Sequence, residues 1–421
     1  MGEQSRGADP VQKRRREFGR WAAASALVAA VGFYYRVTWG DLSGFVGAID
    51  AIPVLFADFF LHFLPAGQQM LAEHRPGPLF VYSPTFALSL APLTAVPTEL
   101  EAFACGAFEI SASLALLAVS LWILRSDHPA FGPLCVVGFI TSFPILHNFA
   151  WGQVSVPLTL CVLLGYTCHD RGWIAAAAGL LAYAIAIKYY VAIFLVYFLF
   201  RRDLPFLAWC LAASVLLMVA LPAAVMGLET TLEYYETTSH TLSLLGPRIS
   251  RDLNSQYLPH LATRLFRAAP AERDWIFEAA RLLGYGVVAS NLAILWIRIR
   301  RALPGAGTLS FVVLSLSIPF FAPTSWPHYF SYLPFCQGFL ALSVPREPTA
   351  GRRVVLASTV LLSVLLSNVI FFNLWGDWRA YAAGGTLFVS NFLLLIGVYA
   401  TVLPQLAGSS GRPPTTNQEA R

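Results

Sequence analysis

The chain has 421 residues, of which 57% are hydrophobic, 14% aromatic and only 12% charged. Soluble domains carry about 25% charged residues, so this composition excludes an ordinary soluble globule and indicates an integral membrane protein. The net charge of +5 does not indicate nucleic-acid binding, because Lys and Arg cluster at the ends of apolar segments, where they set membrane orientation. The six cysteines mostly fall inside apolar segments without metal-binding spacing, and we predict neither a metal nor a cofactor.

The N-terminal part of the chain alternates between basic, apolar and mixed segments. Residues 1–20 form a basic tail that is expected in the cytoplasm, and residues 21–405 are expected to form one transmembrane domain. A first span is predicted at about 21–38. Residues 41–97 are predicted to be the first outer loop, with short apolar segments broken by Pro and Gly. The segment 79–95 is too short to cross a bilayer, so we expect it to re-enter or to lie on the membrane.

The remaining chain is predicted to consist of apolar helices separated by short turns. A long outer loop, 227–275, interrupts them, and the tail 406–421 is rich in Gly, Ser, Pro and Thr and is expected to be disordered in the cytoplasm. The apolar segments lie at about 101–124, 131–147, 153–168, 172–187, 189–200, 206–226, 276–297, 308–322, 329–343, 353–373 and 384–404.

The basic residues indicate how these helices cross the membrane. If 79–95 re-enters, about twelve helices span the bilayer and the short basic turns at 201–202 and 298–301 lie on the cytoplasmic side, as the positive-inside rule expects. If 79–95 spanned fully, both turns would lie outside, so we prefer the re-entrant arrangement. The predicted fold class is therefore an all-α, polytopic membrane protein.

This topology places the chemically rich turns on one membrane face. The outer turns at 147–153, 187–190 and 323–329 carry aromatic, amide, His and Lys side chains, whereas the inner turns carry mainly Arg, Pro and Gly. No phosphate-binding loop, dinucleotide fingerprint or zinc-protease motif is present. The inner turns are also too short to form a site for a soluble nucleotide sugar, so we expect chemistry at the outer face.

Asp58 and Lys188 are the charged candidates for catalysis. Asp58 stands between Ala57 and Phe59, and apolar surroundings raise a carboxyl pKa toward that of a useful general base. The alternative is an ordinary loop carboxylate or a helix cap. Lys188 is one of two lysines in the chain and the one expected outside. It either stabilises a phosphate leaving group or anchors a helix end at the membrane interface.

Polar and aromatic residues in the same turns are candidates for substrate binding. Gln153 is predicted to contact a sugar hydroxyl or a phosphate, because an amide in lipid costs free energy unless it is paired. His147 shares its turn. Trp326 suits stacking on a sugar face and His328 suits a hydrogen bond or phosphate contact, although interfacial anchoring explains Trp equally well. In the long loop, Arg251 and Asn254 either bind an anionic head group or are simply solvated.

The ordered set of these short motifs resembles glycosyltransferase family 87, a bacterial branch of the GT-C membrane fold, over about residues 20 to 400. The motifs are Asp58-Phe59, Ala66-Gly67, Tyr82 and Pro84 before Ala91-Pro92-Leu93, Gly152-Gln153, Ala186-Ile187-Lys188, Asn254-Ser255 and Ser325-Trp326-Pro327-His328. Two positions depart from the family pattern. His62 stands where a tyrosine is usual, and Ser83 stands where the first proline of Tyr-Pro-Pro is usual.

The resemblance implies a polyprenyl-phosphate-linked sugar donor, often mannose and sometimes arabinofuranose, and inversion at the anomeric carbon. It implies Asp58 as catalytic base, with Tyr82 and the polar residues above around the substrates. The expected protein is therefore a mannosyltransferase-like enzyme at the outer face of a bacterial inner membrane, acting on a glycolipid or glycan acceptor. The alternatives are a transporter or flippase of lipid-linked sugars and a non-catalytic membrane subunit. A transporter predicts inverted repeats and charges along a membrane path, and the sequence shows neither.

Overall fold

The computed structural model describes residues 55–77, 80–126, 128, 130–249, 252–266, 270–303, 305–375 and 378–408. Over these residues the chain is helical, and the one extended pairing is the isolated bridge between Ser142 and Asn368. The expected all-α class is confirmed for this part of the chain. The predicted basic tail 1–20, the first span and most of the tail 406–421 lie outside the described residues.

Five helical segments in the described part of the chain are long and apolar enough to cross a bilayer. They are α5 (Thr98–Ile123), the continuous run α11, η4 and α12 (Leu204–Val215, Leu216–Ala220, Leu221–Met226), α15 (Pro270–Arg300), α18 (Ala350–Ser367) and α20 (Thr386–Gly408). A sixth crossing exists if α7 (Phe143–Trp151) and α8 (Ser155–Asp170), bent by 118°, form one broken span. These helices agree with a polytopic membrane protein, and the expected number of about twelve spans stays a prediction.

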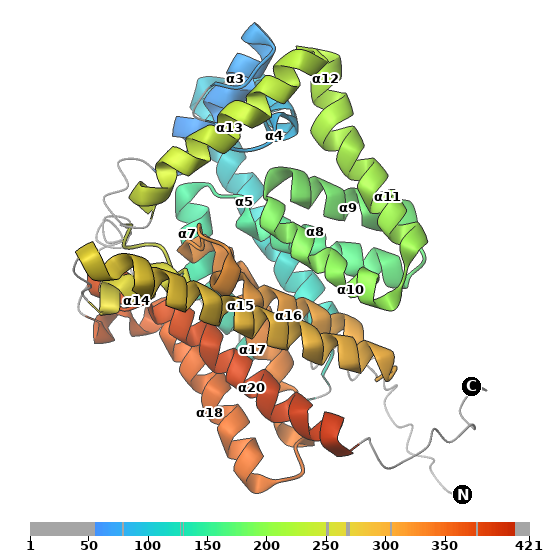
Figure 1. Ribbon diagram of the computed structural model, residues 1–421, viewed down its shortest axis with the longest axis vertical. Helices are drawn as coiled ribbons and strands as arrows, with labels where there is room; N and C mark the ends of the chain where they lie inside the picture. Colours follow the sequence, from blue (N-terminus) through green and yellow to red (C-terminus); the bar gives the residue numbers. More distant parts are fainter. Residues whose placement is uncertain are drawn as a thin grey trace, which may run out of the picture.

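Shorter apolar helices complete the bundle. They are α6 (Phe131–Ile140), α9 (Ile174–Ile187), η3 with α10 (Tyr189–Phe194, Leu195–Arg201) and α16 (Ala306–Phe321). Figure 1 shows α8 to α11 gathered on one side of the molecule. These segments are shorter than the roughly 20 residues that a full span needs.

The described part of the predicted first outer loop folds into a helical group at one end of the molecule (Figure 1). It contains η1 (Phe59–Phe63), α3 (Leu64–Glu73), α4 (Pro84–Leu90) and η2 (Ala91–Ala95), and α13 (Leu228–Ile249) crosses over it in Figure 1. The Tyr234 hydroxyl on α13 donates to the carbonyl oxygen of Tyr82 at 2.8 Å, which ties the two segments together. Much of the predicted long loop is thus helical, since α13 is followed by α14 (Leu258–Leu265).

The C-terminal helices form a second group, in which α18 packs along α20 and α15 along α16 (Figure 1). The other members are η5 (Pro327–Tyr332), α17 (Leu333–Ala341), η6 (Val344–Arg346), η7 (Val369–Leu374) and α19 (Trp378–Ala383). Helix α16 is buried from Leu309 to Phe320, so it is central in the bundle. Buried amides link the helices: Gln337 on α17 donates to Ser363 at 3.0 Å and to Ser367 at 2.9 Å on α18.

Helix breaks rather than helix interiors carry the polar residues singled out by the sequence. Helix α7 ends at Gly152, whose φ of +64° a residue with a side chain adopts at a cost. Helix α9 ends at Lys188, which is extended and precedes the tight turns of η3. Pro327 opens η5. The breaks at Gly152, Lys188 and Pro327 meet in one place. Non-helical backbone within a membrane is tolerated where it is buried in protein or lines a cavity.

Candidate active site

The break between α7 and α8 is held by Asn148. Its side-chain oxygen accepts the backbone N–H groups of Ser155 at 2.9 Å and Val156 at 3.2 Å, which caps the start of α8. Its amide nitrogen donates to the Glu109 carboxylate on α5 at 2.7 Å. Both side chains are buried. The turn carrying Gln153 is therefore anchored from the middle of a neighbouring membrane helix.

Asp58 lies at the start of η1, against this same turn. Phe56, which precedes it, has a φ of +62° and donates its backbone N–H to the carbonyl oxygen of Ala150 at 2.8 Å. Phe56 and Phe59 are buried around the acid, and its side chain is 20% exposed. Burial raises the pKa of Asp58, against the opposing effect of a hydrogen bond from Gln153. The carboxyl group thus has the character of a general base with limited access from outside.

Lys188 lies on the other side of Gln153. The Gln153 amide nitrogen donates to the Asp58 carboxylate, and Lys188 Nζ donates to the Gln153 amide oxygen at 3.4 Å. The amide therefore joins an acid and a cation without letting them pair directly. Lys188 is 5% exposed, and burial lowers its pKa to about 7, while the Asp58 charge acts to raise it.

The other partners of the Lys188 ammonium are neutral. Nζ lies 3.4 Å from Ser155 Oγ and 3.4 Å from His328 Nε2. It lies 4.1 Å from the centre of the Tyr329 ring and 5.8 Å from that of Tyr82, so aromatic faces support the cation. Burial and the Lys188 charge hold the pKa of His328 well below its ordinary value, which keeps this imidazole neutral. A buried cation with long contacts to neutral groups favours the arrival of an anion.

A cavity of about 870 Å³ opens beside the ammonium. Lys188, Tyr82 and Trp326 line one part of it, and Arg273 and Asp274 on α15 line another. Most of its remaining wall is aromatic or aliphatic, contributed by Tyr189, Tyr190, Phe277, Phe321, Ile187 and Leu242. Asp58 does not line this cavity. The chamber is thus large and mainly apolar, with the buried cation Lys188 at one part of its wall and the exposed Arg273 at another. The Gln153 amide connects Lys188 to the Asp58 carboxylate.

The structure brings six of the predicted site residues together: Asp58, Tyr82, Gln153, Lys188, Trp326 and His328. The ring of His147 lies 5.5 Å from that of His328, and both histidines are buried without lining the cavity. Asn254 lies in the loop that packs on the turn before Trp326, where Gln256 N donates to the Ser325 carbonyl oxygen at 2.8 Å. Arg251 lies outside the described residues.

Three contributors were not selected from the sequence. Ser155 and Tyr329 contact Lys188, but hydroxyl and aromatic residues are too common in such turns to be recognised individually. Glu109 had a usable signal, because an acid inside a predicted apolar span is rare and generally has a partner. Among the described residues, no group of three or more His, Cys, Asp or Glu side chains is placed to hold a metal ion.

Comparisons with known proteins identify the family. The family model for glycosyltransferase family 87 matches residues 80–323. A polyprenol-phosphate-mannose-dependent alpha-(1-2)-phosphatidylinositol mannoside mannosyltransferase of Mycolicibacterium smegmatis is 25% identical over 60% of this chain and 60% of its own length. A protein of the same description from Mycobacterium tuberculosis is 29% identical over 52% of this chain and 48% of its own length.

These alignments cover less than two thirds of either relative. No solved structure matches the chain significantly. The family match, by contrast, extends over more than half of the chain and includes Tyr82, Gln153, Lys188 and Asn254. The chain therefore belongs to glycosyltransferase family 87.

Proposed function

We propose that this protein transfers a sugar, mannose in the first instance, from a polyprenyl-phosphate donor to a hydroxyl group of a glycolipid or glycan. The observation that carries the proposal is the Gln153 amide, which joins the Asp58 carboxylate to the buried Lys188 ammonium beside the apolar cavity. The two relatives are named for a polyprenol-phosphate-mannose donor and a phosphatidylinositol mannoside acceptor, which makes that acceptor class the first to test.

In the proposed reaction Asp58 removes the proton of the acceptor hydroxyl group while the oxygen of that hydroxyl group attacks the anomeric carbon of the donor. The bond between that carbon and the phosphate oxygen breaks, and its electron pair leaves with the phosphate. Lys188 stabilises the resulting negative charge. Attack from the face opposite the leaving group inverts the anomeric carbon. The raised pKa of Asp58 suits proton removal near neutral pH, and the long contacts of Lys188 leave the ammonium able to accept a phosphate.

The two substrates would approach from different sides of Gln153. The 870 Å³ cavity suits the lipid phosphate and the first isoprene units, because apolar and aromatic walls meet a single buried cation there. Trp326 and Tyr82 would contact the sugar, with His328 beside the phosphate. The acceptor would reach the 20% exposed carboxylate of Asp58 from outside the cavity. A lipid-linked donor can enter by lateral diffusion, which removes any need for a soluble nucleotide sugar.

The proposed topology is a GT-C arrangement of about twelve spans with both termini in the cytoplasm and the site at the outer face of a bacterial inner membrane. Its support is the distribution of arginine. Arg125, Arg171, Arg202, Arg300 and Arg346 belong to turns at the ends of helices remote from Asp58, whereas Lys188 and the chamber lie near the first outer loop.

The deciding experiment is sugar transfer from polyprenyl-phosphate-mannose by the purified protein and by the Asp58→Asn variant. General-base catalysis contributes roughly 10² to 10⁴-fold, so we expect a loss of that size with an unchanged melting temperature. Glu73→Gln, which neutralises an exposed acid of the same loop, is the matched control and should retain activity.

Full activity of the Asp58→Asn variant would remove Asp58 from the mechanism. If the parent protein is inactive, the assay is repeated with a polyprenyl-phosphate pentose. Inactivity with both donors, together with movement of the labelled lipid across proteoliposome membranes, would favour the transporter.

A further inference from the structure

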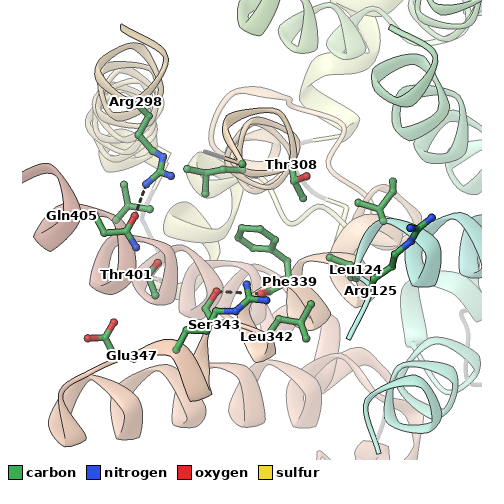
Figure 2. Close-up of a pocket in the computed structure, with 15 residues that line it drawn as sticks. Leu124, Arg125, Arg298, Thr308, Phe339, Leu342, Ser343, Glu347, Thr401 and Gln405 are labelled. Carbon is green, nitrogen blue, oxygen red and sulfur yellow. Dashed lines mark hydrogen bonds between the residues drawn. The ribbon is translucent and has the colours of Figure 1, made fainter. Parts of the chain in front are cut away.

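Figure 2 shows a second cavity, of about 420 Å³, which shares no lining residue with the chamber beside Lys188. It is enclosed by the ends of several helices: the last turn of α5 with Arg125, the last turns of α15 and α20, the start of α16, and the end of α17 with Arg346 beyond it. Its wall carries three arginines and several other polar side chains among aliphatic ones, whereas the chamber beside Lys188 is mainly aromatic.

The distance between the two cavities follows from helix α15. Arg273 lines the chamber near Lys188, and Arg298 lines the second cavity. At 1.5 Å per residue, these positions are roughly 38 Å apart along the helix axis. A bilayer with its head groups is about 40–45 Å thick. The separation of the two cavities along α15 is therefore close to the thickness of a bilayer, as expected of cavities at opposite membrane interfaces.

Three arginines from three different helix ends line the second cavity. Arg298 is 7% exposed, and its guanidinium donates to the side-chain oxygen of Gln405 at 2.6 Å (Figure 2). Arg125 and Arg346 are exposed and line the same cavity from α5 and from η6. The cluster therefore combines one buried, hydrogen-bonded arginine with two exposed ones, of which Arg125 also donates to the Trp122 carbonyl oxygen at 3.0 Å.

The neutral lining combines aliphatic side chains with a few hydrogen-bonding groups that suit an anion. Thr308, Ser343 and Thr401 bring hydroxyl groups to the wall. One acid, Glu347, also lines the cavity, and it lies 3.6 Å from Arg352, which offsets its charge. Arginine and hydroxyl side chains around one polar space match the oxygens of a phosphate group, since the guanidinium fork binds two of them at once.

We propose that this cavity binds a phosphate group at the membrane interface opposite the glycosyltransferase site, and that the phosphate belongs to the head group of an anionic phospholipid. The lipid source is favoured by position, because the cavity lies at the depth of a head group beside membrane-crossing helices. This site is independent of the proposed sugar transfer.

The test measures binding of short-chain phosphatidylglycerol to the full-length protein in detergent, with phosphatidylcholine and inorganic phosphate as parallel ligands. The variant Arg125→Gln/Arg346→Gln removes the two exposed arginines and leaves the buried one in place. We expect its affinity for phosphatidylglycerol to fall by at least tenfold, because each charge-assisted hydrogen bond contributes roughly that factor.

The matched control is Arg202→Gln/Arg300→Gln, which removes the same charge from exposed arginines that do not line the cavity. It should keep the affinity of the parent. Saturable binding of phosphatidylglycerol but not of inorganic phosphate assigns the site to a lipid, and equal binding of both assigns it to phosphate in general. Equal losses in the two double variants, or no saturable binding of either anion, would overturn the proposal.

Discussion

Gly152, at the α7–α8 break, packs directly against Phe56 and Phe59 of the segment that carries Asp58. A methyl group added there would lie 2.9 Å from Cβ of Phe59 and 3.1 Å from Cβ of Phe56, whereas ordinary contact begins at 3.4 Å. The η1 segment must then retreat by about 0.5 Å. We expect Gly152→Ala to destabilise the protein by about 1–2 kcal/mol from the left-handed backbone and by a further ~1–3 kcal/mol from crowding.

The same retreat moves Asp58, which lies between the two crowded phenylalanines, away from Gln153. A misplacement of about 1 Å in an active site can cost about 10²-fold, so half that distance predicts roughly a tenfold loss of transfer rate. The measurements are the melting temperature and the rate of sugar transfer from polyprenyl-phosphate-mannose.

Gly172→Ala is the matched control. Gly172 has a φ of +78° but no atom within 4 Å of an added methyl group. The loss of stability in Gly172→Ala therefore measures the backbone strain alone. We expect it to lower the melting temperature less and to leave the transfer rate nearly unchanged. If Gly152→Ala transfers sugar as fast as Gly172→Ala, the close approach does not position Asp58 and the reasoning is wrong.

Three further predictions concern the groups around Asp58. The raised pKa of Asp58 predicts that kcat/KM falls with acidification at a pH above the ordinary carboxyl range, because the base must be deprotonated; a profile flat down to pH 4 would contradict this. The Lys188 pKa of about 7 predicts a fall in kcat/KM as pH rises through 7, since the cation is then lost. Lys188→Arg should shift that fall beyond pH 9. If kcat/KM of this variant falls at the same pH as that of the parent, Lys188 is not the group whose deprotonation causes the fall. Asn148→Leu should destabilise the protein by about 1–2 kcal/mol and reduce sugar transfer, because it uncaps α8 and leaves Glu109 unpaired. Glu109→Gln keeps the hydrogen bond and should transfer sugar normally. Equal effects of the two variants would argue against the capping role of Asn148.

The sequence predicted the helical segments well because the signal is local. Each apolar segment of the sequence indicates a helix that is stable in lipid or in a protein interior. The observed α5, α8 and α16 begin and end within a few residues of the predicted segments. Polar residues at the ends of such runs also identified most of the site. Asp58, Gln153 and Lys188 each stand where an apolar segment is interrupted.

The helices and side-chain positions within the predicted loops and turns were harder to predict from the sequence. The region 227–275 contains α13 and α14, although no strong apolar run marks either helix. His147 lies beside His328, and its expected contact with the substrate stays a prediction. Which polar side chains of α7 face the site depends on how α7 is rotated, and an apolar helix with polar residues near its end carries little periodic signal for that rotation.

The sequence by itself determined that this is a membrane protein, that its apolar helices are separated by polar breaks, and that those breaks carry an acid, an amide and a cation. Only the tertiary structure decided which breaks meet. Asp58 and Gln153 are 95 residues apart, and Gln153 and Lys188 are 35 apart, so their contacts depend on helix packing angles and not on local preference. The buried pair Glu109 and Asn148 sets one of those angles, because an amide and a carboxylate in an apolar interior are stable only when each has its partner.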